Sequence, residues 1–161
     1  MHDVTLFDFS IWRLLDTILS LAAAYVLALP LGWERGVKSY AAIGFRTFPI
    51  VSVGACAYLL LSRHLHEIGI YDADGLARVL RALMTGIGFI GGGAIVKRTR
   101  KGEGVSGVAT GASIWTTGAI GACVAHGYYQ IAVALCLTSL FVLDVSPRLA
   151  RRVRRWTSSH S

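Results

Sequence analysis

The amino-acid sequence predicts an all-α polytopic membrane protein, a bundle of about five transmembrane helices with its N-terminus outside and its C-terminus in the cytoplasm. Of the 161 residues, 54% are hydrophobic and only 16% are charged, whereas about 25% of an average soluble protein is charged. Five apolar stretches approach the roughly 20 residues that span a bilayer. Lys and Arg residues gather in alternate gaps between these stretches, as the positive-inside rule requires.

The first two apolar stretches are residues 14–33 and 43–61. The first carries one acid, Asp16, near its start. The second carries Arg46 among its opening residues, so we expect Arg46 to lie at the membrane interface. Both are long enough to cross a bilayer, since the tolerated range is about 17–25 residues.

Three further stretches follow at 76–96, 105–124 and 128–145. The third stretch has Arg78 and Arg81 in its opening turns, whereas the fourth has no charged residue. The gaps between the five stretches are too short for a separate domain. Residues 1–146 are therefore predicted to be one transmembrane domain.

The basic residues predict the orientation. One side of a five-helix arrangement would hold twelve of them: Arg35, Lys38, Arg46, Lys97, Arg98, Arg100, Lys101, Arg148, Arg151, Arg152, Arg154 and Arg155. The other side would hold four: Arg13, Arg63, Arg78 and Arg81. The side rich in Lys and Arg is predicted to be cytoplasmic.

Residues 147–161 are predicted to be a basic cytoplasmic tail. A basic segment next to a membrane helix is attracted to anionic lipid by about 1 kcal/mol for each residue near the surface. We therefore expect the bilayer, and anionic lipid at this tail, to be the partners of the chain. Nucleic acid is not expected to be one.

The stretch "TGIGFIGGGAIV", residues 85–96, satisfies the spacing G-x-G-x-x-G. A dinucleotide-binding fingerprint needs a strand before it, a helix after it and an acid about 20 residues later. Here the preceding residues are helix formers, and position 106 is Ser106. A dinucleotide site is therefore not expected.

Small residues at intervals of four let helices approach closely in a bilayer. Gly88 and Gly92 have this interval, as do Gly107 and Gly111. We therefore expect stretches 76–96 and 105–124 to form the tightly packed centre of the bundle. The predicted helix-packing glycines are Gly86, Gly88, Gly91, Gly92, Gly107, Gly111, Gly118 and Gly121. In the alternative interpretation, neighbouring glycines break the helix and expose carbonyl groups, as in some transporters.

Four stretches together resemble the MgtC/SapB family of bacterial inner-membrane proteins. They are "LGWERG" (31–36), "IGFRTFPIVSVGA" (43–55), "TGIGFIGGGAIV" (85–96) and "GVATGASIWTTGAIGA" (107–122). The resemblance implies five transmembrane helices in the inner membrane and a regulatory role linked to magnesium homeostasis, growth in low magnesium and virulence. The polar and aromatic residues it singles out are Glu34, Arg35, Arg46, Thr47, Arg78, Thr110 and Trp115.

The sequence departs from this family at two points. Many relatives carry a C-terminal ACT-like domain, which is not expected here. Relatives commonly have a sequence close to G-L-T-T-A-A in the fourth stretch, where this chain has Ala109 before Thr110. A role that requires the first of those two threonines is therefore not expected.

Ionisable residues near the membrane suggest two ion pairs, because such residues are usually paired or functional. Glu34 with Arg46 would join the first two helices at the interface, although both could equally be solvated. Asp16 with Arg81 is the second candidate pair, since both are expected at similar depth, and the alternative is that the arginines of the third stretch extend towards water. A weak magnesium site could use Asp72 and Asp74, because Mg²⁺ prefers oxygen ligands. An exposed polar loop explains the same two residues.

The sequence contains no recognisable catalytic motif, so neither an enzyme nor a cofactor is expected. The predicted function is that of a non-enzymatic regulatory membrane protein, with a membrane-protein partner or self-association through the small-residue faces. The alternative is a small transporter or channel subunit for Mg²⁺ or another cation. Its lining would have to come mainly from hydroxyl side chains such as that of Thr110.

Overall fold

The computed structural model describes residues 10–38, 43–99 and 107–158, and at 37–38, 43, 96–99 and 146–158 it describes only the backbone. Within these ranges the chain forms five helices and no strand. They are α1 (Ile11–Lys38), α2 (Ile43–Glu67), α3 (Ala73–Thr99), α4 (Val108–Ala125) and α5 (Tyr129–Ser158). The prediction of an all-α fold is confirmed.

Four of the helices have the length and composition needed to cross a membrane. Their qualifying parts are Ile11–Gly36, Gly44–Glu67, Ala73–Ile95 and Val108–Ala125. In the fifth helix the side chains are described as far as Val145, and the apolar stretch within that limit, Tyr129–Val145, is shorter; the helix itself continues to Ser158. The chain is therefore a multi-pass membrane protein. Which side of the membrane each terminus occupies stays a prediction.

Glycine ends two of the helices in the same way. Gly69 after α2 has φ +77° and Gly127 after α4 has φ +76°, a conformation that other residues rarely adopt. In each turn the glycine N–H and the next N–H donate to carbonyls of the last helical turn, at 2.9 or 3.0 Å. This is the Schellman arrangement, which satisfies carbonyls that would otherwise lack donors. It reverses the chain in very few residues.

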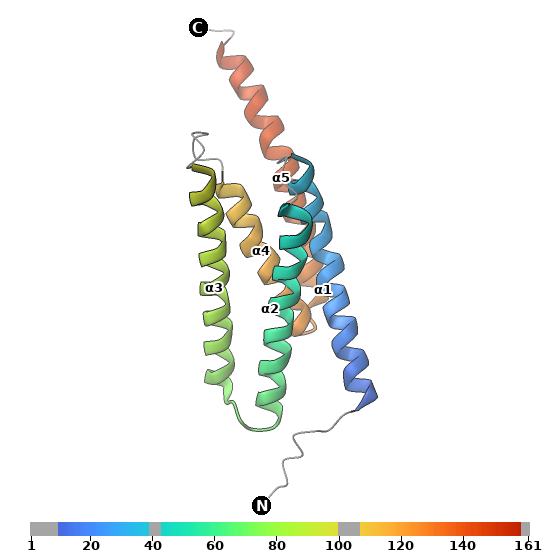
Figure 1. Ribbon diagram of the computed structural model, residues 1–161. Helices are drawn as coiled ribbons and strands as arrows, with labels where there is room; N and C mark the ends of the chain where they lie inside the picture. The colour runs from blue at the N-terminus through green and yellow to red at the C-terminus, as the bar shows by residue number, and fades with distance from the viewer. Residues whose placement is uncertain (1–9, 39–42, 100–106, 159–161) are drawn as a thin grey trace, which may run out of the picture.

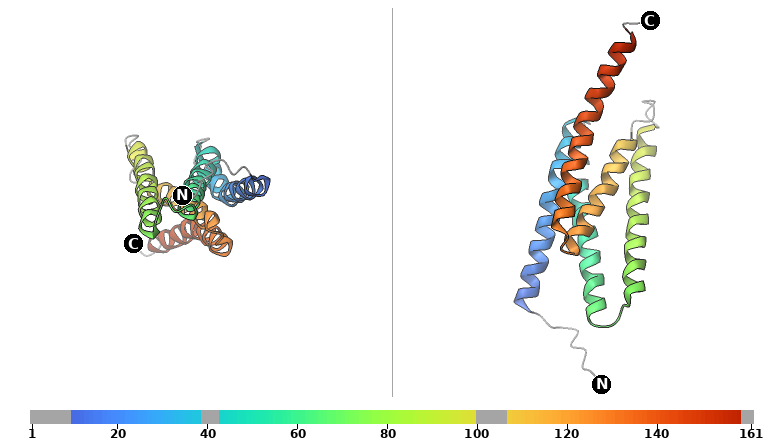
Figure 2. Two further views of the ribbon diagram at one scale, coloured as in Figure 1. Left: turned by 90° about the horizontal axis from the view of Figure 1, so that it is seen from below. Right: turned by 180° about the vertical axis from the view of Figure 1, so that it is seen from behind.

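The axes of the five helices are roughly aligned, successive helices run in opposite directions, and α4 lies at the centre of the bundle (Figures 1 and 2). It packs against all four other helices. Half of its membrane-crossing window is buried, compared with 11% for α3. The prediction that both helices form the packed centre is therefore correct for α4 and wrong for α3, which lies at the edge.

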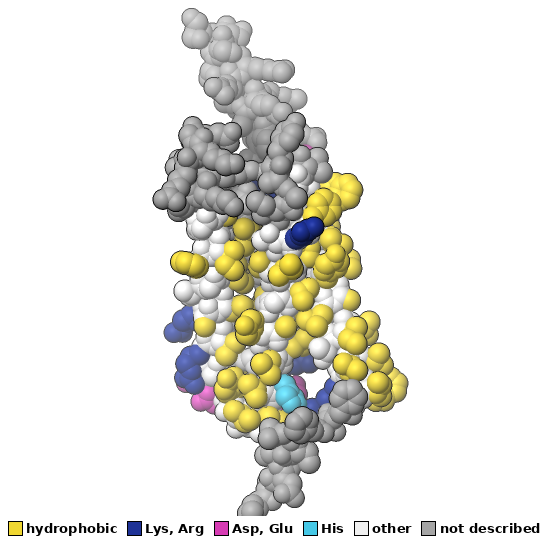
Figure 3. All heavy atoms as spheres, in the orientation of Figure 1, with side chains coloured by type: hydrophobic (Ala, Val, Ile, Leu, Met, Phe, Trp, Pro, Cys, Tyr) yellow, Lys and Arg dark blue, Asp and Glu magenta, His cyan; other side chains and the backbone are white. Residues whose placement is uncertain are grey.

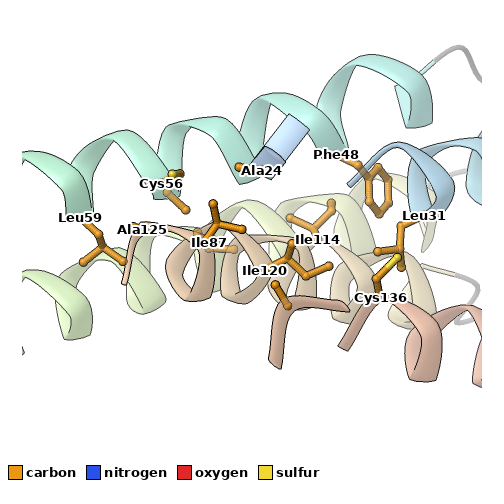
Figure 4. Close-up of a cluster of buried hydrophobic side chains, with 13 residues drawn as sticks. Ala24, Leu31, Phe48, Cys56, Leu59, Ile87, Ile114, Ile120, Ala125 and Cys136 are labelled. Atoms are coloured by element: carbon orange, nitrogen blue, oxygen red, sulfur yellow. The ribbon is translucent and has the colours of Figure 1, made fainter. Parts of the chain in front are cut away.

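The buried apolar side chains form one cluster between α1, α2, α4 and α5, joined by Ile87 of α3 (Figure 4). Leu31, Phe48 and Ile120 are all at most 1% exposed. Outside this cluster many large apolar side chains face away from the protein, such as Phe89 at 84% exposure (Figure 3). An apolar exterior is what a bilayer requires.

The glycine-rich part of α3 does not interrupt the helix. α3 is continuous from Ala73 to Thr99, through Gly91, Gly92 and Gly93. The alternative interpretation of a broken helix with exposed carbonyls is therefore wrong. In the described ranges there is also no strand before these glycines, as a dinucleotide site would need.

Candidate functional site

We call the end of the bundle where α1 and α3 finish and α2 and α4 begin the inner end, and the opposite end the outer end (Figure 1). Under the predicted orientation the inner end is cytoplasmic. The described charged side chains lie close to these two ends, and the middle of the bundle is apolar or carries hydroxyl groups. The two ends are therefore the parts of the molecule that could bind polar partners.

At the inner end α1 and α2 meet through glycines. A Cβ atom added at Gly44 would lie 2.7 Å from the carbonyl O of Gly32 and 2.7 Å from the N of Gly36. Beside this contact the rings of Trp33 and Phe45 meet edge to face, with centroids 5.2 Å apart. Only glycine at these positions lets the two backbones approach so closely.

Glu34 and Arg35 form an ion pair on this junction. Arg35 Nε lies 3.1 Å from Glu34 Oε2, and the two side chains are only 16% and 12% exposed. No ion pair joins Glu34 to Arg46 in the described part of the chain, and Arg46 is exposed. The expected Glu34–Arg46 pair is therefore wrong. Glu34 and Arg35 form a largely buried charged pair within α1 instead.

The hydroxyl groups of α4 are used by the helix itself, with one exception. Ser113, Thr116 and Thr117 donate to the carbonyl oxygens four residues earlier, at 2.7, 3.0 and 2.7 Å. Thr110, one turn nearer the inner end, has a buried Oγ1 for which the described residues supply no hydrogen-bond partner. Among these four residues, Thr110 alone keeps an unused hydroxyl.

The remaining residues singled out by the resemblance are Thr47, Trp115 and Arg78. Thr47 is half-buried on α2, and Trp115 on α4 is 45% exposed. Arg78 lies at the outer end, with Nη2 3.5 Å from Asp72 Oδ1. The seven residues are therefore spread over the two ends of the bundle and its exposed side.

Five of the eight predicted packing glycines lie at close helix contacts. Gly91 faces Gly111, where an added Cβ would be 3.0 Å from the Gly111 carbonyl O. Gly107 faces Ile95, with 2.6 Å from an added Cβ to the Ile95 Cα, and Gly118 faces the Ile87 side chain. These contacts join α3 to α4. The fifth glycine, Gly121, touches the backbone of Ser52 and joins α4 to α2.

The remaining three predicted packing glycines lie elsewhere. At Gly86, Gly88 and Gly92 an added Cβ would meet no atom within 4 Å in the structure described here. All three are on the exposed side of α3. The expectation that Gly88 and Gly92 bring α3 against α4 is therefore wrong. The glycine in contact is Gly91, which lies on the same face as the buried Ile87.

At the outer end one arginine connects three helices. Arg63 of α2 donates from Nη1 to the carbonyl O of Ala125, the last residue of α4, at 3.0 Å. Its Nη2 lies 3.7 Å from Asp16 Oδ2 of α1, and its Nε lies 3.4 Å from Glu67 Oε1. A cation at the C-terminus of a helix also interacts favourably with the helix dipole. Arg63 therefore holds α1, α2 and α4 together at this end.

The expected Asp16–Arg81 pair is wrong. Asp16 lies beside Arg63, and α1 and α3 do not pack against each other in the described ranges. Asp16 does lie at the outer end, at the depth that the sequence predicts, and its partner there is Arg63.

Replacing Arg63 with Met should lower the free energy of unfolding by about 1–2 kcal/mol. The Ala125 carbonyl would lose its donor, and such hydrogen bonds contribute about 0.5–1.5 kcal/mol net. The two ion pairs add little, because their side chains are 40–65% exposed and exposed pairs contribute at most about 1 kcal/mol.

Thermal or denaturant unfolding in micelles measures this loss. The matched control is Arg78→Met, which removes an ion pair whose side chains are 69% and 72% exposed. This control should change stability by less than about 0.5 kcal/mol. Asp16→Asn should also be mild. Equal losses for Arg63→Met and Arg78→Met would contradict the role given to Arg63.

Asp72, in the turn between α2 and α3 at the outer end, has a structural role. Its Oδ1 accepts the N–H of Gly75 at 2.7 Å, which caps the N-terminus of α3. The same oxygen lies near Arg78. In the described part of the chain no group of three or more His, Cys, Asp or Glu residues could hold a metal ion. Asp72 therefore has a structural role as a helix cap, and the weak two-carboxylate site at Asp72 and Asp74 stays a prediction.

Two features of these contacts are absent from the sequence-based predictions. The α1–α2 contact uses Gly32, Gly36 and Gly44. Gly32 and Gly36 are four residues apart, so the small-residue interval could have identified them. The role of Arg63 could not have been found in this way, because no sequence interval relates it to Asp16 or Ala125.

Comparisons with known proteins identify the family of this sequence. Residues 21–152 match the model of the MgtC family. YhiD of Escherichia coli K12 is 30% identical over 141 residues, covering 86% of this chain and 64% of YhiD. SrpB of Synechococcus elongatus is 30% identical over 87% of this chain and 79% of SrpB. MgtC of Salmonella typhimurium LT2 is 30% identical over 86% of this chain and 55% of MgtC.

The chain therefore spans less than two thirds of the length of YhiD and of MgtC. No solved structure matches it significantly. The family match covers all five helices apart from the two ends of the chain, and it includes the glycine contacts and the Glu34–Arg35 pair. The chain belongs to the MgtC family.

Proposed function

We propose that this chain is a non-enzymatic regulatory membrane protein linked to magnesium homeostasis, which acts by binding a membrane-protein partner. Family membership supports the link to magnesium, because YhiD carries the name "Putative magnesium transporter YhiD". The name of that relative also supports an alternative, in which the chain is part of a Mg²⁺ or other cation pathway. The two functions make different demands on the interior of the bundle, because only a cation pathway needs polar groups there that are free to bind an ion.

The observation that favours the regulatory function is the internal use of the α4 hydroxyls. A pathway for a hydrated cation needs polar groups at mid-membrane depth that can replace water ligands. Ser113 and Thr117 are at most 5% exposed, and each donates its hydroxyl to a carbonyl of its own helix. Ser52 of α2 donates instead to another helix, to the carbonyl O of Ala24 in α1 at 2.9 Å. These three hydroxyls already have acceptors within the protein, and Thr110 is the one buried hydroxyl of α4 that the described residues leave without a partner.

The close glycine contacts support the same proposal. Gly121 of α4 touches Ser52 of α2, and Gly111 of α4 touches Gly91 of α3. Backbones this close leave no room for a hydrated ion between the helices concerned. Since α4 packs against all four other helices, a pathway through one copy would have to separate it from at least one of them. A regulatory role requires no such opening.

Ion flux into liposomes separates the two functions. The purified chain would be reconstituted with a Mg²⁺-sensitive dye inside the vesicles, beside protein-free vesicles and vesicles containing an established magnesium channel. We expect no Mg²⁺ entry above the protein-free level, with or without a membrane potential. Clear entry that depends on the protein would overturn the regulatory proposal and support a cation pathway.

A growth experiment tests the magnesium link independently of transport. Loss of the chain from its own organism should slow growth at limiting Mg²⁺, and the intact chain should restore it. Restoration without measurable flux in liposomes is the result that the proposal predicts. Normal growth of the deletion strain at limiting Mg²⁺ would contradict the magnesium link.

A further inference from the structure

The last helix is longer than its apolar part requires. In the sequence of α5 the mainly apolar run ends at Val145, three residues before the first of five arginines, and the helix continues through residues 146–158, which we call the α5 extension. At 1.5 Å per residue the extension is about 20 Å long. It projects beyond the ends of the other helices at the inner end (Figures 1 and 2).

The sequence of the extension is amphipathic in helical register. Leu149, Val153 and Trp156 are separated by four and three residues, so these positions share one face of the helix. Five arginines occupy positions beside or opposite that face: Arg148, Arg151, Arg152, Arg154 and Arg155. A helix with an apolar stripe and a basic remainder is typical of segments that lie in the membrane interface.

If the extension stood perpendicular to the membrane, neither its apolar face nor its basic face would contact lipid. Arg154 and Arg155 are nine and ten residues beyond Val145, which is about 14–15 Å along the helix. The headgroup layer takes up about 5–8 Å of this distance, so both positions would stand about one Debye length, about 8 Å at physiological ionic strength, beyond the headgroups, and screening would weaken their attraction to lipid. The apolar positions would also remain in water. An extension lying along the membrane surface would bring its apolar face to the interface and its basic face to the lipid headgroups.

The point at which the extension could turn is Pro147. Proline has no N–H to donate to the carbonyl of Leu143, and its ring crowds that carbonyl, so a helix bends most easily there. In the sequence Pro147 lies between Val145, the last residue of the mainly apolar run, and Arg148, the first of the five arginines. The border and the weak point of the helix therefore coincide.

We propose that the α5 extension is a hinged amphipathic helix that turns at Pro147 and binds the anionic headgroup surface of the protein's own bilayer. The face that carries positions 149, 153 and 156 is then turned to the interface, and the basic positions lie at the level of the lipid phosphates. The occupant is a lipid surface, because α5 itself crosses the bilayer and keeps the extension beside it. The proposal depends on the chain spanning a membrane and not on its link to magnesium.

The test places a fluorescent label on each face of the extension in the full chain. Cys56, Cys123 and Cys136 are replaced with Ala, and a single cysteine then carries an environment-sensitive dye. Val153→Cys, combined with Arg151→Gln, reports the apolar face. Arg151→Cys reports the opposite face with the same number of arginines. Each protein is reconstituted into vesicles of phosphatidylcholine, with or without phosphatidylglycerol, and quenched with doxyl-labelled lipid.

We expect the label at position 153 to shift to the blue and be quenched in vesicles with phosphatidylglycerol, and the label at 151 to remain in water. Neutralising Arg154 or Arg155 with Gln should lower the ratio of surface-bound to upright extension about fivefold for each residue. High salt should act in the same direction. Pro147→Ala, which removes the hinge, should lower the quenching at 153.

Identical signals at 151 and 153, or a signal at 153 that is the same without phosphatidylglycerol, would overturn the proposal. Burial of the label only after an acidic protein is added would also overturn it, in favour of a protein partner. If the cysteine-free background is unstable, the tryptophan emission of the unmodified chain minus that of Trp156→Phe gives the same comparison. A difference spectrum unaffected by phosphatidylglycerol would then refute the proposal.

Discussion

Replacing Gly121 with alanine is expected to lower the free energy of unfolding by about 3 kcal/mol or more. The added Cβ would collide with the Ser52 carbonyl oxygen and lie 2.9 Å from the Ser52 carbonyl carbon. These are backbone atoms of α2, which cannot rotate out of the way as the end of a side chain can. Overpacking of this kind typically costs about 1–3 kcal/mol, and occasionally more.

The expected loss at Gly121 is at the upper end of that range because the contact supports a second interaction. The Ser52 hydroxyl donates to the Ala24 carbonyl in α1, and Ser52 is fully buried. A shift of α2 away from α4 would therefore disturb the contact between α1 and α2 as well. The α2–α4 interface is also next to the buried Phe48 and Ile120 (Figure 4).

The measurement is unfolding in mixed micelles, by added denaturing detergent or by steric trapping, with helicity monitored by circular dichroism. The matched control is Gly92→Ala, also in the interior of a helix. Here the added methyl meets no atom within 4 Å. It should leave stability unchanged or raise it slightly, because alanine favours a helix by up to about 1 kcal/mol over glycine. A loss at Gly92 as large as that at Gly121 would contradict the steric explanation.

Replacing Gly44 with alanine should have the second largest effect, also at least about 2–3 kcal/mol. The added Cβ would lie 2.7 Å from the Gly32 carbonyl O, 2.7 Å from the Gly36 N and 3.1 Å from the Gly36 Cα. All three are backbone atoms of α1. The methyl group would push the inner ends of α1 and α2 apart, beside the buried Glu34–Arg35 pair.

Gly54→Ala is the control for Gly44→Ala on the same helix, since an added Cβ at Gly54 meets no atom within 4 Å. Cysteine cross-linking between the inner ends of α1 and α2 provides a second readout. Gly44→Ala should slow it, whereas Gly54→Ala should leave it unchanged. Normal stability and cross-linking of the Gly44→Ala protein would show that the two helices tolerate a wider separation.

The sequence was sufficient for the number of helices and for the approximate limits of the first four, whereas α5 continues to Ser158, 13 residues beyond the predicted end at 145. Apolar runs bounded by charged residues indicate spans directly, because the bilayer imposes a minimum length. The sequence did not show which face of each helix points inward. In α3, for example, Gly91 packs against α4, while Gly88 and Gly92 face outward. Both faces of a membrane helix are apolar, so periodicity carries little information about direction.

The polar contacts were less predictable for a related reason. The position of Asp16 near the start of its helix indicates depth in the membrane, but not which neighbouring helix lies beside it. Arg63 and Arg81 are both near the outer end, and only the arrangement of α1 next to α2 selects Arg63. At the inner end, Glu34 has a partner in the next residue, Arg35, which no comparison of helix depths would have suggested.

The central claim is that backbone contact at a subset of the glycines holds the bundle together. The most direct measurement is the unfolding free energy of each single Gly→Ala variant in one detergent system. Losses should be large at Gly44, Gly107 and Gly121, where the added Cβ would meet backbone within 3.0 Å, and negligible at Gly54 and Gly88, where it would meet nothing within 4 Å. Similar losses in both groups would contradict the account.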